Sequence, residues 1–278
     1  MKYLFDSISF ALSKLTTRTY STSFSLGIYC LNRSIHAPIY NIYGFVRFAD
    51  EIVDSFHDHD KRTLLSEFRE ETHKAIKRGI SLNPILNSFQ QVAKRYAIDR
   101  ELIDCFLDSM EMDLDRQIHS AESYKRYVLG SAEVVGLMCL KVFTNGDQAL
   151  YCELKPAAMK LGSAFQKINF LRDIQEDYQT LGRTYFPNVN MAYLSKEDKD
   201  VIELDIEADF KEALEGIKTL PRTARFGVYV AYVYYYALFT KIKGIPSCHI
   251  MMQRIRISNY QKFGLLARSY FKHSLRML

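Results

Sequence analysis

Residues 161–177 of the chain, LGSAFQKINFLRDIQED, carry two stripes with the period of an α-helix. Apolar side chains recur every three or four residues, which predicts an amphipathic helix with one buried face; they are Leu161, Phe165, Ile168 and Leu171. Amide and carboxylate side chains form a second stripe at the same spacing; they are Gln166, Asn169, Asp173 and Asp177. Hard divalent cations such as Mg²⁺ prefer oxygen ligands of this kind. The second stripe therefore indicates a metal-dependent polar site, with a solvated helix face as the alternative.

The rest of the chain has the composition of a helical globular protein. It contains 278 residues, of which 48% are apolar, and only 12 glycines and 6 prolines. This composition excludes a disordered chain, a collagen repeat and a disulfide-stabilised miniprotein. The 37 basic and 32 acidic residues give a formal charge of +5. That excess is too small to indicate a nucleic-acid partner, so none is expected.

Helix boundary signals recur along the chain. Residue types that favour helix N-caps precede several periodic segments: Asp60 before 61–78, Asn83 before 85–96, Asp99 before 100–119, and Ser195 in a sequence that resembles a capping box. About ten helical segments follow one another without a linker rich in Ser, Gly or Pro. We therefore predict a single all-α domain over residues 1–278, with its helices around a common interior.

The cysteines and the apolar stretches predict a cytoplasmic protein. The five cysteines, at 30, 105, 139, 152 and 248, are scattered in apolar helical segments and are expected to be reduced. No signal peptide is evident at the N-terminus, and residues 226–239, interpreted as the most apolar stretch, are too short to span a bilayer. Basic residues near the C-terminus could rest on the anionic inner face of a membrane, or could form a solvated face; they are Arg254, Arg256, Lys262, Arg268, Lys272 and Arg276.

A second predicted helix, residues 39–56, also carries acids on the face that should be buried. Its apolar stripe begins at Ile39 and runs into Asp50 and Asp54, with Arg47 one turn away. A buried carboxylate is costly unless it is paired or bound to a metal. The pattern predicts a helix that lines a polar cavity, and a structural ion pair between Arg47 and Asp50 is the alternative.

Other polar and aromatic groups are interpreted as structural. Two sets of acids lie beside the apolar stripes of their helices and are predicted to face water: Asp104, Asp108, Glu111 and Asp115 in one helix, and Asp205, Asp209 and Glu212 in another. Residues 57–60, HDHD, lie between two predicted helices and are not assigned a metal. Three tyrosines share one helix face and are predicted to make core or membrane-interface contacts: Tyr229, Tyr232 and Tyr236. Tyr235 projects elsewhere.

Four longer motifs, taken in order, resemble those of the squalene/phytoene synthase family, the head-to-head prenyltransferases, and most nearly its bacterial phytoene synthases. They are YGFVRFADEIVD at 43–54, SAEVVGLM at 131–138, QKINFLRDIQED at 166–177 and GRTYFP at 182–187. Shorter matches occur at 21–24 and 254–259. Because the resemblance covers nearly the whole chain, it implies an all-α, isoprenoid-synthase-type helical bundle around a central cavity.

The resemblance implies a role for particular residues. Those implied to hold Mg²⁺, with Mn²⁺ able to replace it, are Asp50, Asp54, Asn169, Asp173 and Asp177. Those implied to contact substrate are Ser23, Arg47, Gln166, Asn169, Arg172, Tyr235 and Arg254. The four aspartates and Arg47 are implied to be catalytic. Carboxylates repel diphosphate anions, so this arrangement is consistent only if divalent metals bridge them and arginines neutralise the remainder.

The resemblance implies an enzyme that condenses two molecules of geranylgeranyl diphosphate through a cyclopropylcarbinyl diphosphate to phytoene, the first committed step of carotenoid synthesis, without NADPH. The cationic intermediates suit an apolar tunnel with aromatic walls, for which the candidates are Phe24, Phe48, Phe165 and Phe170. Two alternatives remain: a squalene or dehydrosqualene synthase that uses farnesyl diphosphate, and a non-catalytic relative that acts as a binding or assembly protein.

One position departs from the family pattern. Relatives usually carry a tyrosine, implicated near the departing diphosphate, where this chain has Leu129. Tyr127 lies two positions away, about 200° around an α-helix, so it could substitute only after a local shift of the helix.

Overall fold

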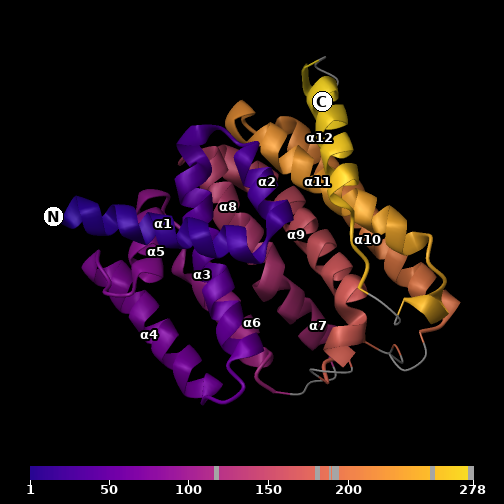
Figure 1. The fold of residues 1–278 in the computed structure, drawn as a ribbon, viewed down its shortest axis with the longest axis horizontal. Helices are drawn as coiled ribbons and strands as arrows, with labels where there is room; N and C mark the ends of the chain where they lie inside the picture. The colour runs from indigo at the N-terminus through magenta and orange to yellow at the C-terminus, as the bar shows by residue number, and fades with distance from the viewer. Residues whose placement is uncertain (116–118, 179–181, 188, 190–193, 251–253, 275–278) are drawn as a thin grey trace.

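The computed structural model describes residues 1–115, 119–178, 182–187, 189, 194–250 and 254–274, with the backbone alone at 22–23, 176, 259 and 272–274. The chain is all-α, as predicted, and the described residues form no β-strand (Figure 1). The α-helices are α1 Lys2–Tyr20, α2 Thr22–Tyr29, α3 His36–Ser55, α4 Lys61–Arg78, α5 Pro84–Arg95, α6 Arg100–Met112, α7 Ala121–Val128, α8 Val134–Thr144, α9 Gln148–Glu176, α10 Lys196–Thr219, α11 Arg222–Lys243 and α12 Asn259–Ser274. Short 3₁₀ turns lie at Arg33–Ile35 and Ser247–His249, and a π-helical turn, η2, joins α7 to α8 at Leu129–Glu133.

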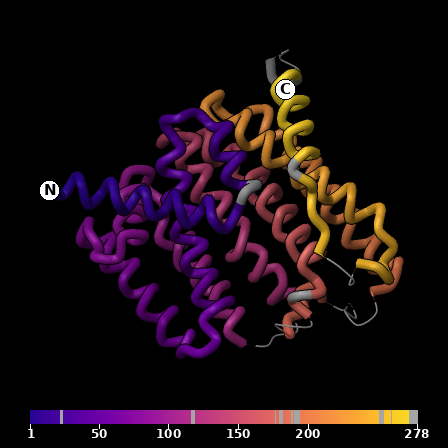
Figure 2. The backbone as a smooth tube through the Cα atoms, viewed as in Figure 1, coloured from indigo at the N-terminus to yellow at the C-terminus, as the bar shows by residue number. Residues whose placement is uncertain are grey.

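The helices form two hydrophobic clusters that share α8. One cluster joins α3, α4, α5 and α6, and the other joins α9, α10 and α11. In Figure 2 the first half of the chain, from indigo to magenta, lies beside the second half, from pink to yellow, with α12 on the outside of α11. Because each half presents apolar stripes to the shared interior, a cavity between them is framed by helices from both halves.

Most predicted helix boundaries are confirmed by side-chain caps. The Asp60 carboxylate accepts a hydrogen bond from the Thr63 backbone N–H at 3.1 Å, and Asn83 and Ser195 cap α5 and α10 in the same way. Gly79 ends α4 at φ +77°, a backbone conformation that a side chain would strain. The sequence patterns of these helix ends therefore act as expected.

The prediction of one helix over residues 100–119 was wrong, because α6 ends at Met112. The next residue, Asp113, leaves the helix and accepts a hydrogen bond from the Tyr127 hydroxyl at 2.7 Å. The helical periodicity beyond Met112 was thus overridden by a tertiary contact. Residues 116–118, the end of the predicted helix, lie outside the described residues.

The prediction of a solvated face on α10 was wrong for Asp209, which is 1% exposed. Its carboxylate accepts hydrogen bonds from three groups of α9: Lys160 Nζ and Ser163 Oγ, each at 2.9 Å, and Lys167 Nζ at 2.6 Å. The neighbouring acids Asp205 and Glu212 are exposed, as predicted. One face of α9 lines the cavity, so a different face must pack against the rest of the protein. On that face these three polar groups hold α9 to α10.

The acids predicted beside the apolar stripe of the α6 segment are exposed or half-exposed, and one of them, Asp115, lies beyond the end of α6. They form ion pairs with α4, including Arg69 Nη1 to Asp108 at 2.8 Å and Arg62 Nη2 to Asp115 at 2.9 Å. Pairs this exposed contribute little to stability.

The most apolar part of the chain is not residues 226–239, as the sequence was interpreted. Among the described residues, one helical run, Ala121–Thr144, is long and apolar enough to cross a membrane by length and composition. Two thirds of its most apolar window is buried inside the protein. A buried core helix passes the same length and composition test, and this run forms the wall shared by the two hydrophobic clusters.

We expect Asp209→Ala to destabilise the protein by about 3–5 kcal/mol, because it leaves the buried Lys167 ammonium without its buried partner. Urea unfolding followed by circular dichroism measures the change. Asp205→Ala is the matched control, since Asp205 contacts the same lysine but is 57% exposed, and should cost less than about 1 kcal/mol. Equal effects of the two substitutions would contradict a buried charge cluster.

Candidate active site

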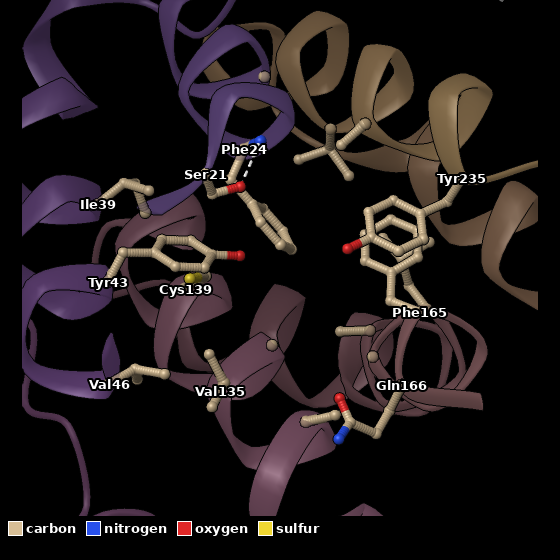
Figure 3. A pocket seen from close by; sticks show the side chains of 18 of the residues that line it. Ser21, Phe24, Ile39, Tyr43, Val46, Val135, Cys139, Phe165, Gln166 and Tyr235 are labelled. Atoms are coloured by element: carbon tan, nitrogen blue, oxygen red, sulfur yellow. Dashed lines mark hydrogen bonds between the residues drawn. The ribbon is translucent and has the colours of Figure 1, made fainter. Parts of the chain in front are cut away.

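A cavity of about 460 Å³ lies between the two halves of the bundle. Residues from α1, α2 and α3 line one side, and residues from α9, α10 and α11 line the other, with α7, η2 and α8 between them. Figure 3 shows Phe24 and Tyr43 on one side of this space and Phe165 and Tyr235 on the other. The rings of Phe24 and Tyr43 lie 4.8 Å apart between centroids, and those of Phe165 and Tyr235 stack at 3.9 Å. The cavity therefore has aromatic walls.

Only two of the four predicted wall phenylalanines face this space. Phe24 and Phe165 line the cavity. Phe170 instead stacks on Tyr185 at 4.1 Å, and Phe48 packs near Phe68 at 5.6 Å. The sequence identified all four because they adjoin the motifs, but neighbours in a helix point in different directions.

The end of α3 brings a cation, Arg47, and an acid, Asp50, to the cavity. Arg47 forms ion pairs with Asp50 and, at 2.7 Å, with Glu51, and its guanidinium lies 4.3 Å from the centre of the Tyr20 ring. The ion pair offered as an alternative does exist, yet Arg47 and Asp50 both line the cavity. The buried Arg47 Nε has no hydrogen-bond partner among the described residues. An unpaired buried donor on a cation suits an anionic ligand.

The polar stripe of α9 faces α3 across the same cavity, as predicted. Gln166, Asn169 and Arg172 line it. The Tyr235 hydroxyl donates to Asn169 Oδ1 at 3.4 Å, so α11 contributes to this polar surface. Arg254 Nε lies 2.9 Å from Asp173, and Arg172 Nε lies at the same distance from the same carboxylate. Two arginines from distant segments thus converge on one aspartate.

A third group joins the two aspartate motifs, and it was not assigned a role from the sequence. Arg183 Nη1 donates to Asp54 at 2.8 Å, Nη2 donates to the Asp113 carbonyl at 2.9 Å, and its backbone N–H donates to the Asp177 carbonyl at 2.8 Å. The motif GRTYFP contains Arg183, which was the available signal. Asp113 gave no signal, because it lies just beyond a helix end and outside every motif.

The predicted site residues fall into three sets. Those that line the cavity are Arg47, Asp50, Gln166, Asn169, Arg172, Tyr235 and Arg254. Those tied to it through an arginine or a backbone contact are Asp54, Asp173 and Asp177. The side chain of Ser23 lies outside the described residues. The described side chains thus bring residues from three distant parts of the sequence to one end of the cavity.

Three carboxylates near this end of the cavity have raised pKa values. Burial and the neighbouring Asp54 raise the pKa of Asp50 to about 7, and burial and Asp173 raise the pKa of Asp177 to about 8. Burial also raises the pKa of Asp113 to about 7. A bound divalent cation would stabilise the ionised form of these carboxylates, because its positive charge offsets both their mutual repulsion and the cost of their burial.

The donor chemistry fits Mg²⁺, provided that the substrate completes the coordination. Carboxylate and amide oxygens are the ligands that Mg²⁺ prefers. Within the part of the chain that the structure describes, no three His, Cys, Asp or Glu side chains lie close enough together to hold an ion by themselves. Mg²⁺ is commonly bound by one or two carboxylates together with substrate phosphates, so divided donors on α3 and α9 suit a metal bridged by a diphosphate.

The departure at position 129 has a structural explanation. Leu129 opens the π-turn η2 and packs against the first hydrophobic cluster, whereas Tyr127 lines the cavity. A Cβ on Gly130 would lie 2.5 Å from the Cys105 carbonyl oxygen, so glycine allows η2 to approach α6 this closely. The π-turn changes the register of the wall. Tyr127 itself lies in α7, two residues before the π-turn begins, and lines the cavity.

Comparisons with known proteins agree with this site. The family model described as squalene/phytoene synthase matches residues 17–261. The chain belongs to the squalene/phytoene synthase family. Members of this family are prenyltransferases, so the predicted enzyme class is confirmed at the level of the family. The all-α fold around a cavity is confirmed as well.

Individual relatives differ in their named products. The chain is 26% identical over 284 residues to the phytoene synthase of Arthrospira platensis, covering 93% of this chain and 91% of that protein. It is 31% identical over 189 residues to the presqualene diphosphate synthase of Rhodopseudomonas palustris, covering 66% of this chain and 65% of that protein. A crystal structure of a dehydrosqualene synthase shares the fold, with a TM-score of 0.84 and 20% identity over 98% of both chains.

We expect the stability of the metal-free protein to fall as pH rises from about 5 to about 8. The native pKa values of Asp50 and Asp177 lie above that of an unfolded aspartate, so the folded state binds more protons in this range. Added Mg²⁺ should reduce the loss, because it favours the ionised carboxylates. The melting temperature measured in EDTA and in Mg²⁺ across this range checks both effects.

Asp177→Asn should flatten this pH profile and raise the melting temperature at pH 8, since it removes a charge that is costly there. Asp115→Asn, at an exposed ion pair with Arg62, should leave the profile unchanged. A melting temperature that rises with pH in EDTA would refute this account of the site.

Proposed function

We propose that this protein catalyses the Mg²⁺-dependent head-to-head (1'-1) condensation of two geranylgeranyl diphosphates, through a cyclopropylcarbinyl diphosphate, to phytoene, the first committed step of carotenoid synthesis. The observation that carries the proposal is the division of one cavity into a charged end and a long apolar end. Carboxylates and arginines gather at the first, and the side chains of the second are aliphatic, aromatic or small.

The charged end suits a diphosphate. Asp50, Asp54, Asp173 and Asp177, with Asn169, would hold Mg²⁺, which supplies Lewis-acid stabilisation of the departing diphosphate. Arg47, Arg172 and Arg254 would bind the remaining phosphate oxygens. In the structure Arg47 is ion-paired with Asp50, and Arg172 and Arg254 are ion-paired with Asp173. The unpartnered Nε of Arg47 gives such an oxygen a donor without breaking an existing bond.

The length of the apolar end favours a C20 chain. Cavity-lining residues on α9 run from Leu154 to Arg172, about 27 Å at 1.5 Å per residue. A geranylgeranyl chain is about 19 Å long and a farnesyl chain about 14 Å, since each C–C bond of ~1.5 Å advances an extended chain by about 1.25 Å. The 27 Å length holds an extended C20 chain together with its diphosphate placed at Arg172, whereas the shorter C15 chain leaves more of the apolar end unfilled.

The walls suit a carbocation. Tyr43, Phe24, Phe165 and Tyr235 surround the middle of the cavity, where their ring faces can stabilise positive charge and exclude water. The overall conversion releases two diphosphates and two protons, so no reductant is required. Phytoene formation therefore needs no NADPH.

A farnesyl substrate is the second candidate, and a specific observation favours it. Similar proteins bear the names presqualene diphosphate synthase and dehydrosqualene synthase. The same charged end would serve the shorter substrate, and the difference between the two functions lies in the apolar end alone.

We expect purified protein with Mg²⁺ to convert geranylgeranyl diphosphate to phytoene faster than it converts farnesyl diphosphate to any C30 product. Chromatography of the hydrocarbons identifies each product. EDTA should abolish turnover, and NADPH should change nothing. Faster C30 formation would establish the second candidate, and folded protein that forms neither product would reject catalysis and favour a binding role.

A variant of the tunnel tests the length argument. Ala158 lines the cavity about 21 Å from Arg172 along α9. Ala158→Phe should shorten the apolar end and lower the preference for the C20 over the C15 substrate. Ala158→Gly, which leaves the length unchanged, is its control.

We further propose that the protein is cytoplasmic and rests on the inner face of a membrane through α12. Four exposed aromatic residues lie within one third of the circumference of this helix: Tyr260, Phe263, Tyr270 and Phe271. Tyr260 is 91% exposed and Phe271 is 66% exposed. Arg256 and Arg268 are exposed beside this aromatic face, and the combination suits an anionic lipid surface.

The other basic residues of this segment contribute less or are not described. Arg254 is used in the cavity, where it pairs with Asp173. The side chains of Lys272 and Arg276 lie outside the described residues.

We expect the protein to float with anionic vesicles of phosphatidylglycerol and phosphatidylcholine, and less with phosphatidylcholine alone. Phe263→Ser with Phe271→Ser should lower the bound fraction about tenfold or more, since each inserted ring contributes about 1.5–3 kcal/mol. Leu4→Ser, at an exposed site on α1, is the control and should have no effect. Equal flotation of all variants would reject α12 as the membrane contact.

A further inference from the structure

The proposed condensation requires a base inside a cavity that excludes water. Joining C1 of one prenyl chain to C1 of another, by way of a cyclopropane, requires loss of a proton from C1 of the chain that has lost its diphosphate, since that carbon forms two bonds to the other chain. A second C1 proton is lost when the central double bond of phytoene forms. The same first proton is lost whether the chain is C20 or C15. The inference below rests on the proposed function, and it concerns where this proton goes.

Tyr127 is a buried hydroxyl at the cavity wall. It lines the cavity, and its oxygen donates a hydrogen bond to Asp113 Oδ2 at 2.7 Å. The ring packs against Tyr185 at 5.2 Å between centroids and against Phe170 at 5.9 Å. The Tyr185 hydroxyl also hydrogen-bonds to this oxygen. A phenol oxygen has two lone pairs, so with its own proton directed to a carboxylate Tyr127 still keeps one lone pair to accept another proton.

Asp113 is suited to receive the proton from Tyr127. Its side chain is 6% exposed, and its nearest cationic partner, Arg183 Nε, stands 3.8 Å away, which is beyond hydrogen-bond distance. Arg183 commits one nitrogen to Asp54 and another to the Asp113 carbonyl. The Asp113 carboxylate is therefore buried, weakly neutralised and hydrogen-bonded to a group that faces substrate. Burial raises its pKa to about 7, in agreement with this geometry.

Of the other acid–base groups that line the cavity, Tyr43 and Cys139 hydrogen-bond to no carboxylate among the described residues, and the rest are committed elsewhere. Asp50 is paired with Arg47 and belongs to the proposed metal site. The Tyr235 hydroxyl donates to the neutral oxygen of Asn169, which cannot take its proton. Tyr20, which lies near Glu51, is half exposed at the end of α1, where water competes. Tyr127 thus combines a cavity position, burial and a carboxylate partner.

We propose that Tyr127 and Asp113 form the catalytic base of the condensation. The C1–H bond breaks, and its electron pair closes the new carbon–carbon bond and neutralises the carbocation. The proton passes to Tyr127 Oη, and the original phenolic proton passes to Asp113 Oδ2. Tyr127 ends the step neutral and Asp113 ends it protonated, so charge and atoms balance without an oxidant or a reductant.

The turnover of substrate deuterated at C1 tests this proposal. With Mg²⁺ and the substrate that the wild type prefers, Tyr127→Phe should lower kcat by about 100-fold, the lower range for a general base. The ratio of rates for unlabelled and C1-deuterated substrate should rise above that of the wild type, because proton removal becomes rate-limiting. KM should stay as in the wild type. A purely structural role of the hydroxyl would lower stability without raising the isotope ratio.

Two further variants make the outcome decisive. Tyr124→Phe removes a hydroxyl from the same helix but from a residue that does not line the cavity, and should retain wild-type rate and isotope ratio. Asp113→Asn should reproduce the raised isotope ratio of Tyr127→Phe. Where Asp113→Asn fails to fold, as circular dichroism would show, Tyr127→Phe alone decides.

An unchanged rate and isotope ratio in Tyr127→Phe would overturn the catalytic base and leave the proposed function standing. A wild type that releases no hydrocarbon and no cyclopropylcarbinyl diphosphate from either substrate would overturn the proposed function, and the base with it.

Discussion

Repulsion among partly buried carboxylates is the constraint that the charged end of the cavity must satisfy. Asp50, Asp54 and Asp177 belong to two helices that the fold brings to the same end of one cavity, and Asp113 lies beside them. Burial and the neighbouring carboxylates together raise the pKa values of Asp50 and Asp177. The fold tolerates the arrangement because Arg183 bridges Asp54 to the Asp113 backbone, and Arg47 and Arg172 pair with their neighbours. A site of this kind is relieved by divalent cations, and cations in turn attract diphosphate.

The helix α9 shows how one element can serve both a polar site and the packing of the fold. Its cavity face carries Gln166, Asn169 and Arg172. Its opposite side carries Lys160, Ser163 and Lys167, which close on the buried Asp209 of α10. A helix with an apolar stripe between two polar ones is fixed in its rotation about its own axis. Turning it either way would separate a charged group from its partner and bury that group unpaired. The orientation of the cavity-lining polar stripe is therefore secured by an ion cluster on the other side of the helix.

The charged and apolar ends of the cavity bear on different questions, the family of the protein and the length of its substrate. The charged end is built from the motifs that place the chain in the squalene/phytoene synthase family, and it suits any prenyl diphosphate. The apolar end is lined by small and aliphatic residues such as Ala158, Gly216 and Leu154, whose volumes determine the length of chain that fits. Relatives with differently named products can thus share one charged end. The wall between the ends contains the π-turn Leu129–Glu133, and Tyr127, two residues before it, lines the cavity.

The sequence by itself determined the all-α class and most helix ends, and it predicted the polar stripe that lines the cavity, because these depend on local propensity, on capping and on the helical period. Asp60, Asn83 and Ser195 act over three or four residues, and the stripe from Gln166 to Asp177 is fixed by the geometry of one helix. Only the tertiary structure decided the burial of Asp209, the end of α6 at Met112 and the contact of Asp113 with Tyr127. These features depend on which helices meet, and charge pairing across 42 residues or more leaves no periodic signal in the chain. The carboxyl groups of Asp209 and Asp115 are indistinguishable in the sequence, and the neighbouring helix alone decides that one is buried and the other solvated.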